Sequence, residues 1–461
     1  MTRAAAIVLA AGLLASTTAA AAPDFSTLDS AIVAEMKGSA TPGAAVAVVL
    51  GDSVVFRRGY GVASIETGEP VTPSTLFRVA STTKMLVAAA VATLADQGRV
   101  DLSAPVATYA DGLDPSIGRL TLHQLLSHTA GLSDESVWDG PHDEAALGAF
   151  VRSWGGERFF TEPGQVHSYS NPGYVLAGHV LAEAADTTFD GAMARLVFRP
   201  LGMHASTTLP TAAMTRPLAQ AHDLGRSGPF VVRPFPDDAR FRPNGGVYTS
   251  ADEFLRFARA FVHGGAEGLS AGAVALLSRT HGRRPGGDPA DTSWIAYGLV
   301  ARKIGAVRVF QHGGARLGSG SVVRLAPERR FAVVILTNRT GSYLPKALEA
   351  ITALALGPTA AAAKPAAAMA ATRFERGERD DLVGTWVNHE PDIVLELAVV
   401  GDTLRAGHRG QVSAVAPVVV KLGRQRYAFG GQEIEAIPGP DGRTAYLHLA
   451  GRALARRASR E

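Results

Sequence analysis

RVASTTKMLVAAAVATL, from Arg78 to Leu94, places Ser81 and Lys84 at the head of a run of small apolar residues. The run predicts a buried helix, and residues three apart on a helix lie on the same face. We therefore expect the serine hydroxyl and the lysine amine to be neighbours near the first helical turn. Unpaired backbone N–H groups there carry partial positive charge and can stabilise an oxyanion formed when the serine attacks a carbonyl.

A lysine pressed against an apolar face has a chemical use. Loss of hydration disfavours the ammonium form, so the pKa of Lys84 is expected to fall, and the neutral amine can then accept the proton of Ser81. Moving that pKa from about 10.4 towards 7 costs roughly 4 to 5 kcal/mol. The alternative is a helix-capping serine followed by a lysine that extends into solvent, and the spacing alone does not separate the two.

Two further groups of polar residues favour the chemical interpretation. SYSNPGYVLAGHVL brings Tyr169 and Asn171 into a turn just before a predicted helix. FQHGGARLGSGS places His312, Gly313 and Gly314 at the end of a predicted strand, where glycines let a substrate approach the backbone. Taken singly, each has an ordinary explanation, a tyrosine in a turn and a histidine beside a flexible hairpin.

Ser-x-x-Lys, Tyr-x-Asn and His-Gly-Gly, in this order, resemble the serine β-lactamase and penicillin-binding protein superfamily. The similar branch contains class C β-lactamases, D-aminopeptidases, D,D-carboxypeptidases and esterases. LFRVASTTK, LTLHQLLSHTAGL and PNGGVYTSADEFLRFA also look like that branch. The resemblance extends roughly from Asp24 to Gly357.

The resemblance implies a role for each motif residue. Ser81 would be the acyl-accepting nucleophile, and Lys84 and Tyr169 would share the proton transfer. The oxyanion hole would consist of the backbone N–H of the nucleophile and that of Ala315. The substrate-binding residues would be Asn171, His312, Gly313, Gly314 and Ala315. His128 in the HTAGL turn is expected to be a packing residue.

This chain departs from the penicillin-recognising pattern at one motif. Those members carry Lys-Thr-Gly where this chain has His312, Gly313 and Gly314. A histidine with an ordinary pKa near 6.5 is largely neutral at pH 7, and Gly313 has no hydroxyl, so attraction of a substrate carboxylate should be weaker. Arg316 either replaces that charge or faces solvent. The departure favours esters, amides or D-amino-acid peptides over β-lactams.

The predicted function is an exported serine hydrolase that forms a Ser81 acyl-enzyme on small-molecule ester, amide or peptide substrates, including peptidoglycan-derived ones. One alternative is a class C-like β-lactamase or penicillin-binding D,D-carboxypeptidase. Another is a sensor that binds peptidoglycan without turnover, although a pure binder has no need of a desolvated lysine beside a serine. GLSAG around Ser270 resembles a hydrolase nucleophile motif, but no strand precedes it, so Ser270 is predicted to cap a helix.

The strands and helices alternate in a way that predicts the fold class. Strands are expected near both ends of the larger domain, and helices fill its middle. Strands are predicted at residues 43–64 (two strands), 297–314, 318–329 and 330–338, and helices at 120–128, 172–185, 189–203 and 251–264. We therefore expect an α/β (α+β) fold of the β-lactamase/transpeptidase type, an antiparallel sheet flanked by helices with a helical subdomain. Short alternating runs near the C-terminus predict a small antiparallel β-barrel.

Length and composition predict two domains in this chain of 461 residues. Residues 1–22 have a basic start, a short apolar core and small residues at a cleavage position, which predicts a signal peptide and a periplasmic or secreted protein. After its removal no integral membrane segment is expected. The predicted divisions are a hydrolase domain at 23–357, an Ala/Pro linker at 358–379 and the barrel domain at 380–461.

Other functional classes find little support. The chain has no cysteine, so no disulfide contributes to its stability. A net charge of +3 without a dense basic stripe argues against nucleic acid as a partner. The 13 histidines are scattered without metal-ligand spacing, and no Gly-rich segment has the context of a phosphate site. We expect neither a metal nor a cofactor, and no pattern specifies an oligomeric state.

Overall fold

The computed structural model describes residues 25, 27–135, 139–285, 293–357, 373–375, 377–388, 394–408, 412, 413 and 415–457. The predicted signal peptide and most of the predicted linker lie outside these residues. Within the described ranges, no helix has the length and apolar character needed to cross a membrane.

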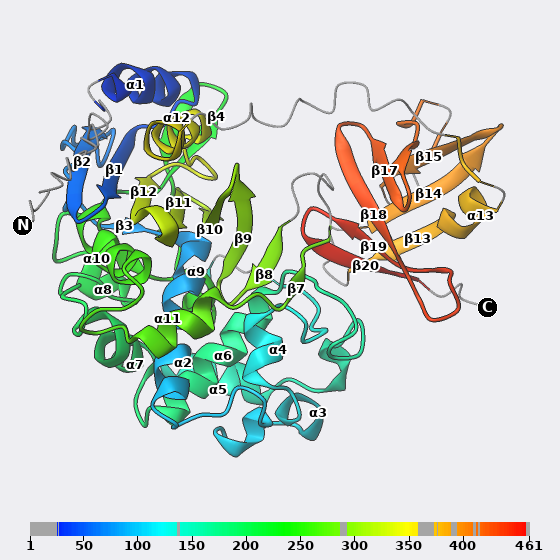
Figure 1. Ribbon diagram of the computed structural model, residues 1–461, viewed down its shortest axis with the longest axis horizontal. Helices are drawn as coiled ribbons and strands as arrows, with labels where there is room; N and C mark the ends of the chain where they lie inside the picture. The colour runs from blue at the N-terminus through cyan, green and yellow to red at the C-terminus, as the bar shows by residue number, and fades with distance from the viewer. Residues whose placement is uncertain are drawn as a thin grey trace, which may run out of the picture.

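An eight-stranded antiparallel sheet, the main sheet, is the centre of the larger part of the chain (Figure 1). Its order is β2 (Ser53–Gly61), β1 (Gly43–Leu50), β12 (Phe331–Thr337), β11 (Ser319–Ala326), β10 (Val307–Arg316), β9 (Leu299–Ile304), β8 (Trp294–Ala296) and β7 (Gly282–Arg283). Val46 of β1 lies opposite Ile335 of β12, so strands from opposite ends of this region pair at the sheet centre. The predicted antiparallel sheet closed by terminal segments is confirmed.

The sequence assigned one strand to residues 297–314, and this prediction is wrong. β9 and β10 form a hairpin there, with Ile304 opposite Val307. The turn between them contains Gly305 at φ +59°, a conformation that glycine adopts without steric cost. A run of alternating residues does not reveal such a tight reversal.

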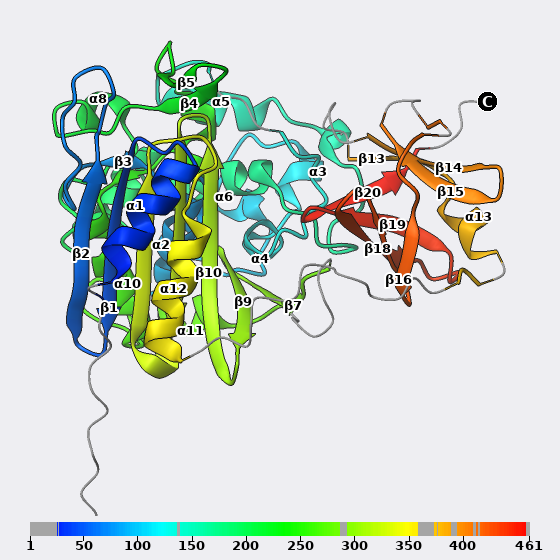
Figure 2. The same cartoon turned by 90° about the horizontal axis from the view of Figure 1, so that it is seen from above.

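Helices cover both faces of the main sheet (Figure 2). On one face, α1 (Leu28–Gly38) and α12 (Pro345–Leu356) lie against Val46 and Val48. On the other, α2 (Thr83–Asp96) and α10 (Ala251–Val262) share a core with Ala45 and Ala47. Because successive strand residues point to opposite faces, the fully apolar β1 serves both cores.

The helical region between the two groups of strands surrounds α6 (Asn171–Ala184), most of which is buried. The predicted helices at 120–128, 172–185 and 251–264 are found as α4 (Leu122–Leu126), α6 and α10, whereas 189–203 is divided between α7 (Phe189–Met193) and a π-helical turn at Ala194–Phe198. The remaining helices of this region are α3 (Pro115–Gly118), α5 (Ala145–Arg152), α8 (Pro210–Ala213), α9 (Arg242–Gly245) and α11 (Ala271–Ser278). Two short ribbons pair β3 (Phe77–Arg78) with β6 (Tyr248–Thr249), and β4 (His222–Gly225) with β5 (Gly228–Val231).

A second eight-stranded antiparallel sheet, the barrel, follows α13 (Glu378–Leu382) and confirms the predicted C-terminal fold. Its order is β15 (Thr403–Gly407), β14 (Val394–Val400), β13 (Gly384–Val387), β20 (Arg452–Arg456), β19 (Thr444–Leu449), β18 (Gln432–Pro438), β17 (Arg426–Phe429) and β16 (Val420–Gly423). Trp386, Leu397 and Leu447 lie in its core. The barrel is nearly closed, because the N–H of Val419 donates to the carbonyl of Leu404 across the two edges.

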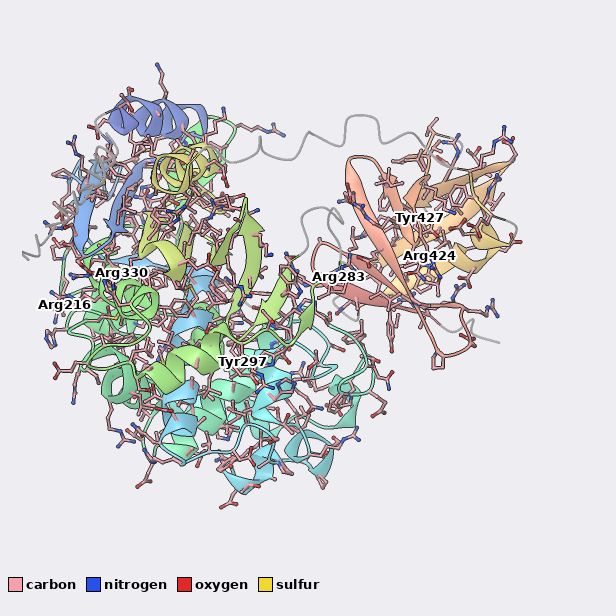
Figure 3. The ribbon with its side chains drawn as sticks, in the orientation of Figure 1. Arg216, Arg283, Tyr297, Arg330, Arg424 and Tyr427 are labelled. Atoms are coloured by element: carbon pink, nitrogen blue, oxygen red, sulfur yellow. The ribbon has the colours of Figure 1, made fainter. Side chains whose placement is uncertain are left out.

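The barrel contacts the main sheet and the helical region directly. Arg283 on β7, labelled in Figure 3, binds Glu435 of β18 with 2.6 Å between Nη1 and Oε1. The hairpin between β19 and β20 contacts the segment around Tyr169. The barrel therefore reaches the region of the predicted catalytic residues.

Candidate active site

Ser81 lies in a short 3₁₀ turn, Ala80–Thr82, immediately before α2. Ala80 has φ +49°, a sparsely populated conformation for a residue with a Cβ. Side chains fix the turn, because Ser321 Oγ of β11 donates to the carbonyl of Val79 at 2.6 Å. Thr82 Oγ1 donates to the same carbonyl at 2.7 Å. The serine is thus presented on a strained turn that the main sheet supports.

Lys84 is fully buried, and its amine has three oxygen neighbours. Nζ lies 2.9 Å from Asn171 Oδ1 and 2.8 Å from the carbonyl oxygen of Asn244, both of which only accept hydrogen bonds. The third neighbour is Ser81 Oγ at 3.3 Å. A neutral amine has two hydrogens and one lone pair. Donation to the two carbonyl oxygens leaves the lone pair for the serine hydroxyl.

The surroundings of Lys84 favour this neutral form. Burial holds the pKa of Lys84 well below its usual value, and the nearby Arg452 and Arg316 lower it further. Asp134 acts in the opposite direction and raises it. The net direction, a lowered pKa caused mainly by burial, is the one predicted from the sequence.

Tyr169 and Asn171 line the same pocket as Ser81. Lys84 Nζ lies 4.9 Å from the centre of the Tyr169 ring. Burial raises the pKa of Tyr169, although the nearby Ser81 hydroxyl acts against this. Asn171 is the first residue of α6 and lines the same pocket. His128 packs 4.6 Å from the Tyr169 ring and accepts a hydrogen bond from a backbone amide through Nδ1, as expected of a packing residue.

The His312 to Ala315 segment forms the end of β10 and packs beside the Ser81 turn. Gly313 and Ala315 line the pocket. His312 Nδ1 is 2.6 Å from the carbonyl oxygen of Gly313. Burial lowers the pKa of His312 to about 3, so its ring is neutral at pH 7. The backbone of this segment therefore lies beside the serine, and its histidine adds no positive charge there at pH 7.

Substitution of Gly314 by alanine is expected to damage this arrangement. A Cβ there would lie 2.3 Å from Ser321 Oγ and 2.5 Å from the carbonyl oxygen of Val79. The clash should lower the free energy of unfolding by about 1 to 3 kcal/mol. Because it displaces the strand beside Ser81, activity should fall by about a hundredfold.

Gly313→Ala is the matched control, because its added Cβ would meet only one atom, at 3.8 Å. Denaturant unfolding and labelling of Ser81 by a fluorophosphonate should be measured for both variants. Equal behaviour of Gly314→Ala and Gly313→Ala would contradict the packing argument.

The residues converge on an open pocket of about 390 Å³. Its lining residues are Ala80, Ser81, Tyr169, Asn171, Asn244, Gly245, Gly313, Ala315, Arg316 and Arg452. None of these lining residues is acidic. Arg316 is buried against this pocket, so the alternative in which it faces solvent is wrong. Burial lowers the pKa of Arg316 to about 9, which still leaves it a cation at pH 7.

Sequence reasoning did not assign a role to four residues of this site. Asn244 belongs to the PNGG stretch, whose similarity to the family was visible. Ser321 follows the glycines in GSGS and carried no distinguishing signal. Asp134 and Arg452 lie 318 residues apart in the chain, and only the docked barrel brings them together.

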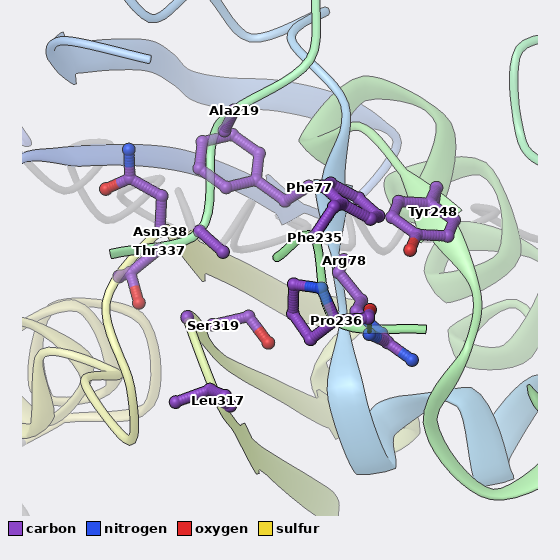
Figure 4. A pocket seen from close by; sticks show the side chains of 12 residues that line it. Phe77, Arg78, Ala219, Phe235, Pro236, Tyr248, Leu317, Ser319, Thr337 and Asn338 are labelled. Carbon is purple, nitrogen blue, oxygen red and sulfur yellow. Dashed lines mark hydrogen bonds between the residues drawn. The ribbon is translucent and has the colours of Figure 1, made fainter. Parts of the chain in front are cut away.

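A second, smaller cavity lies near this site between the main sheet and the β3–β6 ribbon (Figure 4). Phe77, Phe235 and Tyr248 form part of its wall. Its volume is about 10 Å³, which suits a single water molecule and excludes a substrate.

In the part of the chain that the structure describes, neither a metal site nor a second nucleophile is found. Among the residues that the structure describes, no group of three or more His, Cys, Asp or Glu side chains is arranged to bind a metal ion. Ser270 caps α11 through a hydrogen bond from the N–H of Ala273, which confirms its predicted structural role.

Comparison with known proteins gives a family and several related folds. The profile of the Beta-lactamase family matches residues 28–356. "Penicillin-binding protein 4" of Amycolatopsis lactamdurans is 30% identical over 312 residues, which are 64% of this chain and 81% of that protein. "Protein flp" of Staphylococcus aureus (strain MW2) is 23% identical over 70% of this chain, and the matched region spans 64% of that protein's length.

Solved structures share the fold at low sequence identity. SurE superposes with a TM-score of 0.77 at 24% identity, over 94% of this chain and 98% of SurE. The octameric penicillin-binding protein homologue from Pyrococcus abyssi has a TM-score of 0.65 at 20% identity, over 94% of this chain and all (100%) of that one. A class C beta-lactamase from Rhodobacter sphaeroides has a TM-score of 0.57 at 24% identity, over 71% and 97% of the two chains.

Proposed function

Because the chain belongs to the beta-lactamase family, whose members are generally serine hydrolases, we propose that it hydrolyses ester or amide bonds through an acyl-enzyme on Ser81. The observation that carries the proposal is the geometry of Lys84. Its buried amine is bonded to two carbonyl oxygens and faces the serine hydroxyl at 3.3 Å. A serine in such surroundings is an activated nucleophile.

In the proposed acylation, the neutral Lys84 amine accepts the Ser81 proton as Oγ attacks the substrate carbonyl. The oxyanion is stabilised by the backbone N–H groups of Ser81 and Ala315. Tyr169, which lines the same pocket as the serine, passes a proton to the leaving group. Water then attacks the acyl-enzyme with the same groups acting in reverse order. Loss of one oxyanion donor would raise the barrier by about 3 to 4 kcal/mol.

The proposed substrates are small esters, amides and peptides that contain D-amino acids, including peptidoglycan-derived ones. Support comes from the neutral His312 at the position of the family's lysine, and from the structure of SurE, whose fold is similar and which was solved with D-Leu. We place the protein outside the cytoplasm, on the basis of the signal-like residues 1–22 and of family members that are often periplasmic or secreted.

A second candidate is a D,D-carboxypeptidase or β-lactamase type of activity on substrates with a free carboxylate. It is favoured by Arg316, whose guanidinium borders the pocket beside Ala315. Guanidinium groups bind carboxylates strongly. This candidate requires the arginine to take over the role that a lysine has in penicillin-recognising relatives.

The test compares three substrates with the purified protein: a nitrophenyl ester, a chromogenic cephalosporin and a D-alanyl amide. We expect repeated turnovers, with the ester fastest, and a transient acyl adduct on the peptide containing Ser81 in intact and digested mass spectra. Fastest turnover of the cephalosporin would favour the second candidate. A stoichiometric adduct that is never released would instead indicate a binding sensor, and turnover without an adduct on Ser81 would refute the mechanism.

A further inference from the structure

The segment that carries Tyr169 and Asn171 is bonded to the barrel through its backbone. The N–H of Tyr169 donates to the carbonyl of Gly451, in the β19–β20 turn, at 2.9 Å. Ser168 Oγ accepts from the N–H of Ala453 at 3.1 Å and from Asn388 Nδ2 at 3.2 Å. Ala453 lies in β20 of the barrel, and Asn388 directly follows β13, the first strand of the barrel. The barrel is thus part of the frame that orients the proposed catalytic tyrosine.

A buried carboxylate connects this seam to the lysine. Asp134, whose side chain has no exposed surface, accepts the N–H of Asn171 through Oδ1 at 2.7 Å. Its Oδ2 accepts Arg452 Nε at 2.7 Å, and the same guanidinium also bonds through Nη2. Asn171 in turn accepts a hydrogen bond from Lys84. A continuous chain of contacts therefore runs from the barrel, through Asp134, to the proposed base.

The two charges of this pair act on Lys84 in opposite directions. Asp134 stabilises the ammonium form and raises the pKa of Lys84, whereas Arg452 lowers it. Without Arg452, the buried carboxylate would be left without its guanidinium, and a protonated Lys84 would become more favourable. The guanidinium of Arg452 also lies 5.4 Å from the centre of the Tyr169 ring. The other titratable or charged groups around the lysine are Tyr169, Tyr174, His128, His312 and Arg316.

A buried ion pair is weak evidence for stability, because desolvation of the two ions offsets their attraction. What matters for this site is where the pair of Asp134 and Arg452 lies relative to Lys84. We infer that Asp134 is a positioning residue that makes the site competent only when Arg452 of the docked barrel neutralises it, so that the active site is shared between the main sheet, the helical region and the barrel. This inference rests on the proposed function.

The test measures the rate at which a fluorophosphonate modifies Ser81, by intact mass, as a function of pH. For Arg452→Gln we expect labelling at pH 7 to be slower by about tenfold, with the acid limb of the profile shifted to higher pH by roughly one unit. Asp134→Asn should shift the acid limb in the opposite direction. The double variant Asp134→Asn/Arg452→Gln should recover most of the lost rate, since the unpaired carboxylate is gone.

Arg283→Gln is the matched control, because it removes an ion pair between the main sheet and the barrel at the more exposed contact with Glu435. It should label within about twofold of wild type, as most exposed ion pairs contribute little. Thermal unfolding of each variant separates loss of folding from loss of reactivity, and Arg452→Lys should restore part of the rate.

The outcomes are distinguishable. If Arg452→Gln labels at the wild-type rate with an unchanged acid limb, or if the double variant labels no faster than Arg452→Gln, the inference about Asp134 is overturned and the proposed function stands. If the wild-type protein is not labelled at any pH, the proposed function fails and the inference fails with it.

Discussion

Replacing Ser81 by alanine is expected to lower kcat/KM for a nitrophenyl ester by about 10⁴-fold or more, because the acyl-enzyme can no longer form. The exchange removes one hydroxyl from a turn whose backbone is fixed by other side chains, so the protein should remain folded. Initial rates and intact mass spectra would provide the measurement, and no adduct should be detected on the variant.

Ser270→Ala serves as its control. That hydroxyl caps α11, and its loss should cost about 1 kcal/mol of stability without a change in activity. Ester hydrolysis that survives Ser81→Ala, or that is lost in Ser270→Ala, would exclude the proposed nucleophile.

Lys84→Met should be almost as damaging, with kcat/KM lower by roughly 10²- to 10⁴-fold, because a thioether of similar length cannot accept the serine proton. In the wild-type protein the acid limb of kcat/KM should follow protonation of Lys84, so activity falls as pH drops through its lowered pKa. A wild-type profile that is flat down to the acid unfolding of the protein would argue against a lysine base.

The same variant has a second expected effect, on stability. The pKa of Lys84 in the folded protein lies below its unfolded value of 10.5, so between these two values the unfolded chain binds the extra proton. The free energy of unfolding of wild type should therefore rise with pH up to about 10.5, and this contribution should be lost as pH falls towards the folded pKa. Denaturant unfolding at pH 7 and 10 should show a smaller rise for Lys84→Met.

Short-range features of this site were predictable from the sequence, because they depend on spacing. Ser81 and Lys84 are three residues apart, and a helical turn of any kind brings such residues together. The sequence placed the serine in the first helical turn, whereas the structure has it in a 3₁₀ turn behind the strained Ala80. Backbone strain of this kind is set by the packing of Ser321 against the turn, which no local pattern reveals.

Long-range features could be predicted only in outline. Strand-like runs near both ends of the larger domain indicated an antiparallel sheet, whereas the burial of β1 on both faces became apparent only in the structure. The contact between Asp134 and Arg452 depends on how two hydrophobic cores dock, and the sequence around either residue does not indicate its partner in the other part of the chain. The hairpin at Gly305 was missed for a related reason, since one glycine is an ambiguous turn signal.

The pairing of β1 with β12 affects how the protein can fold during its synthesis. A ribosome releases residues 43–50 long before residues 331–337, so the middle of the main sheet stays incomplete until nearly all of this region has been translated. Contacts between such distant segments are slow to form, because the loop-closure entropy is paid before they contribute stability. The nascent chain therefore cannot complete the centre of this sheet for most of its synthesis.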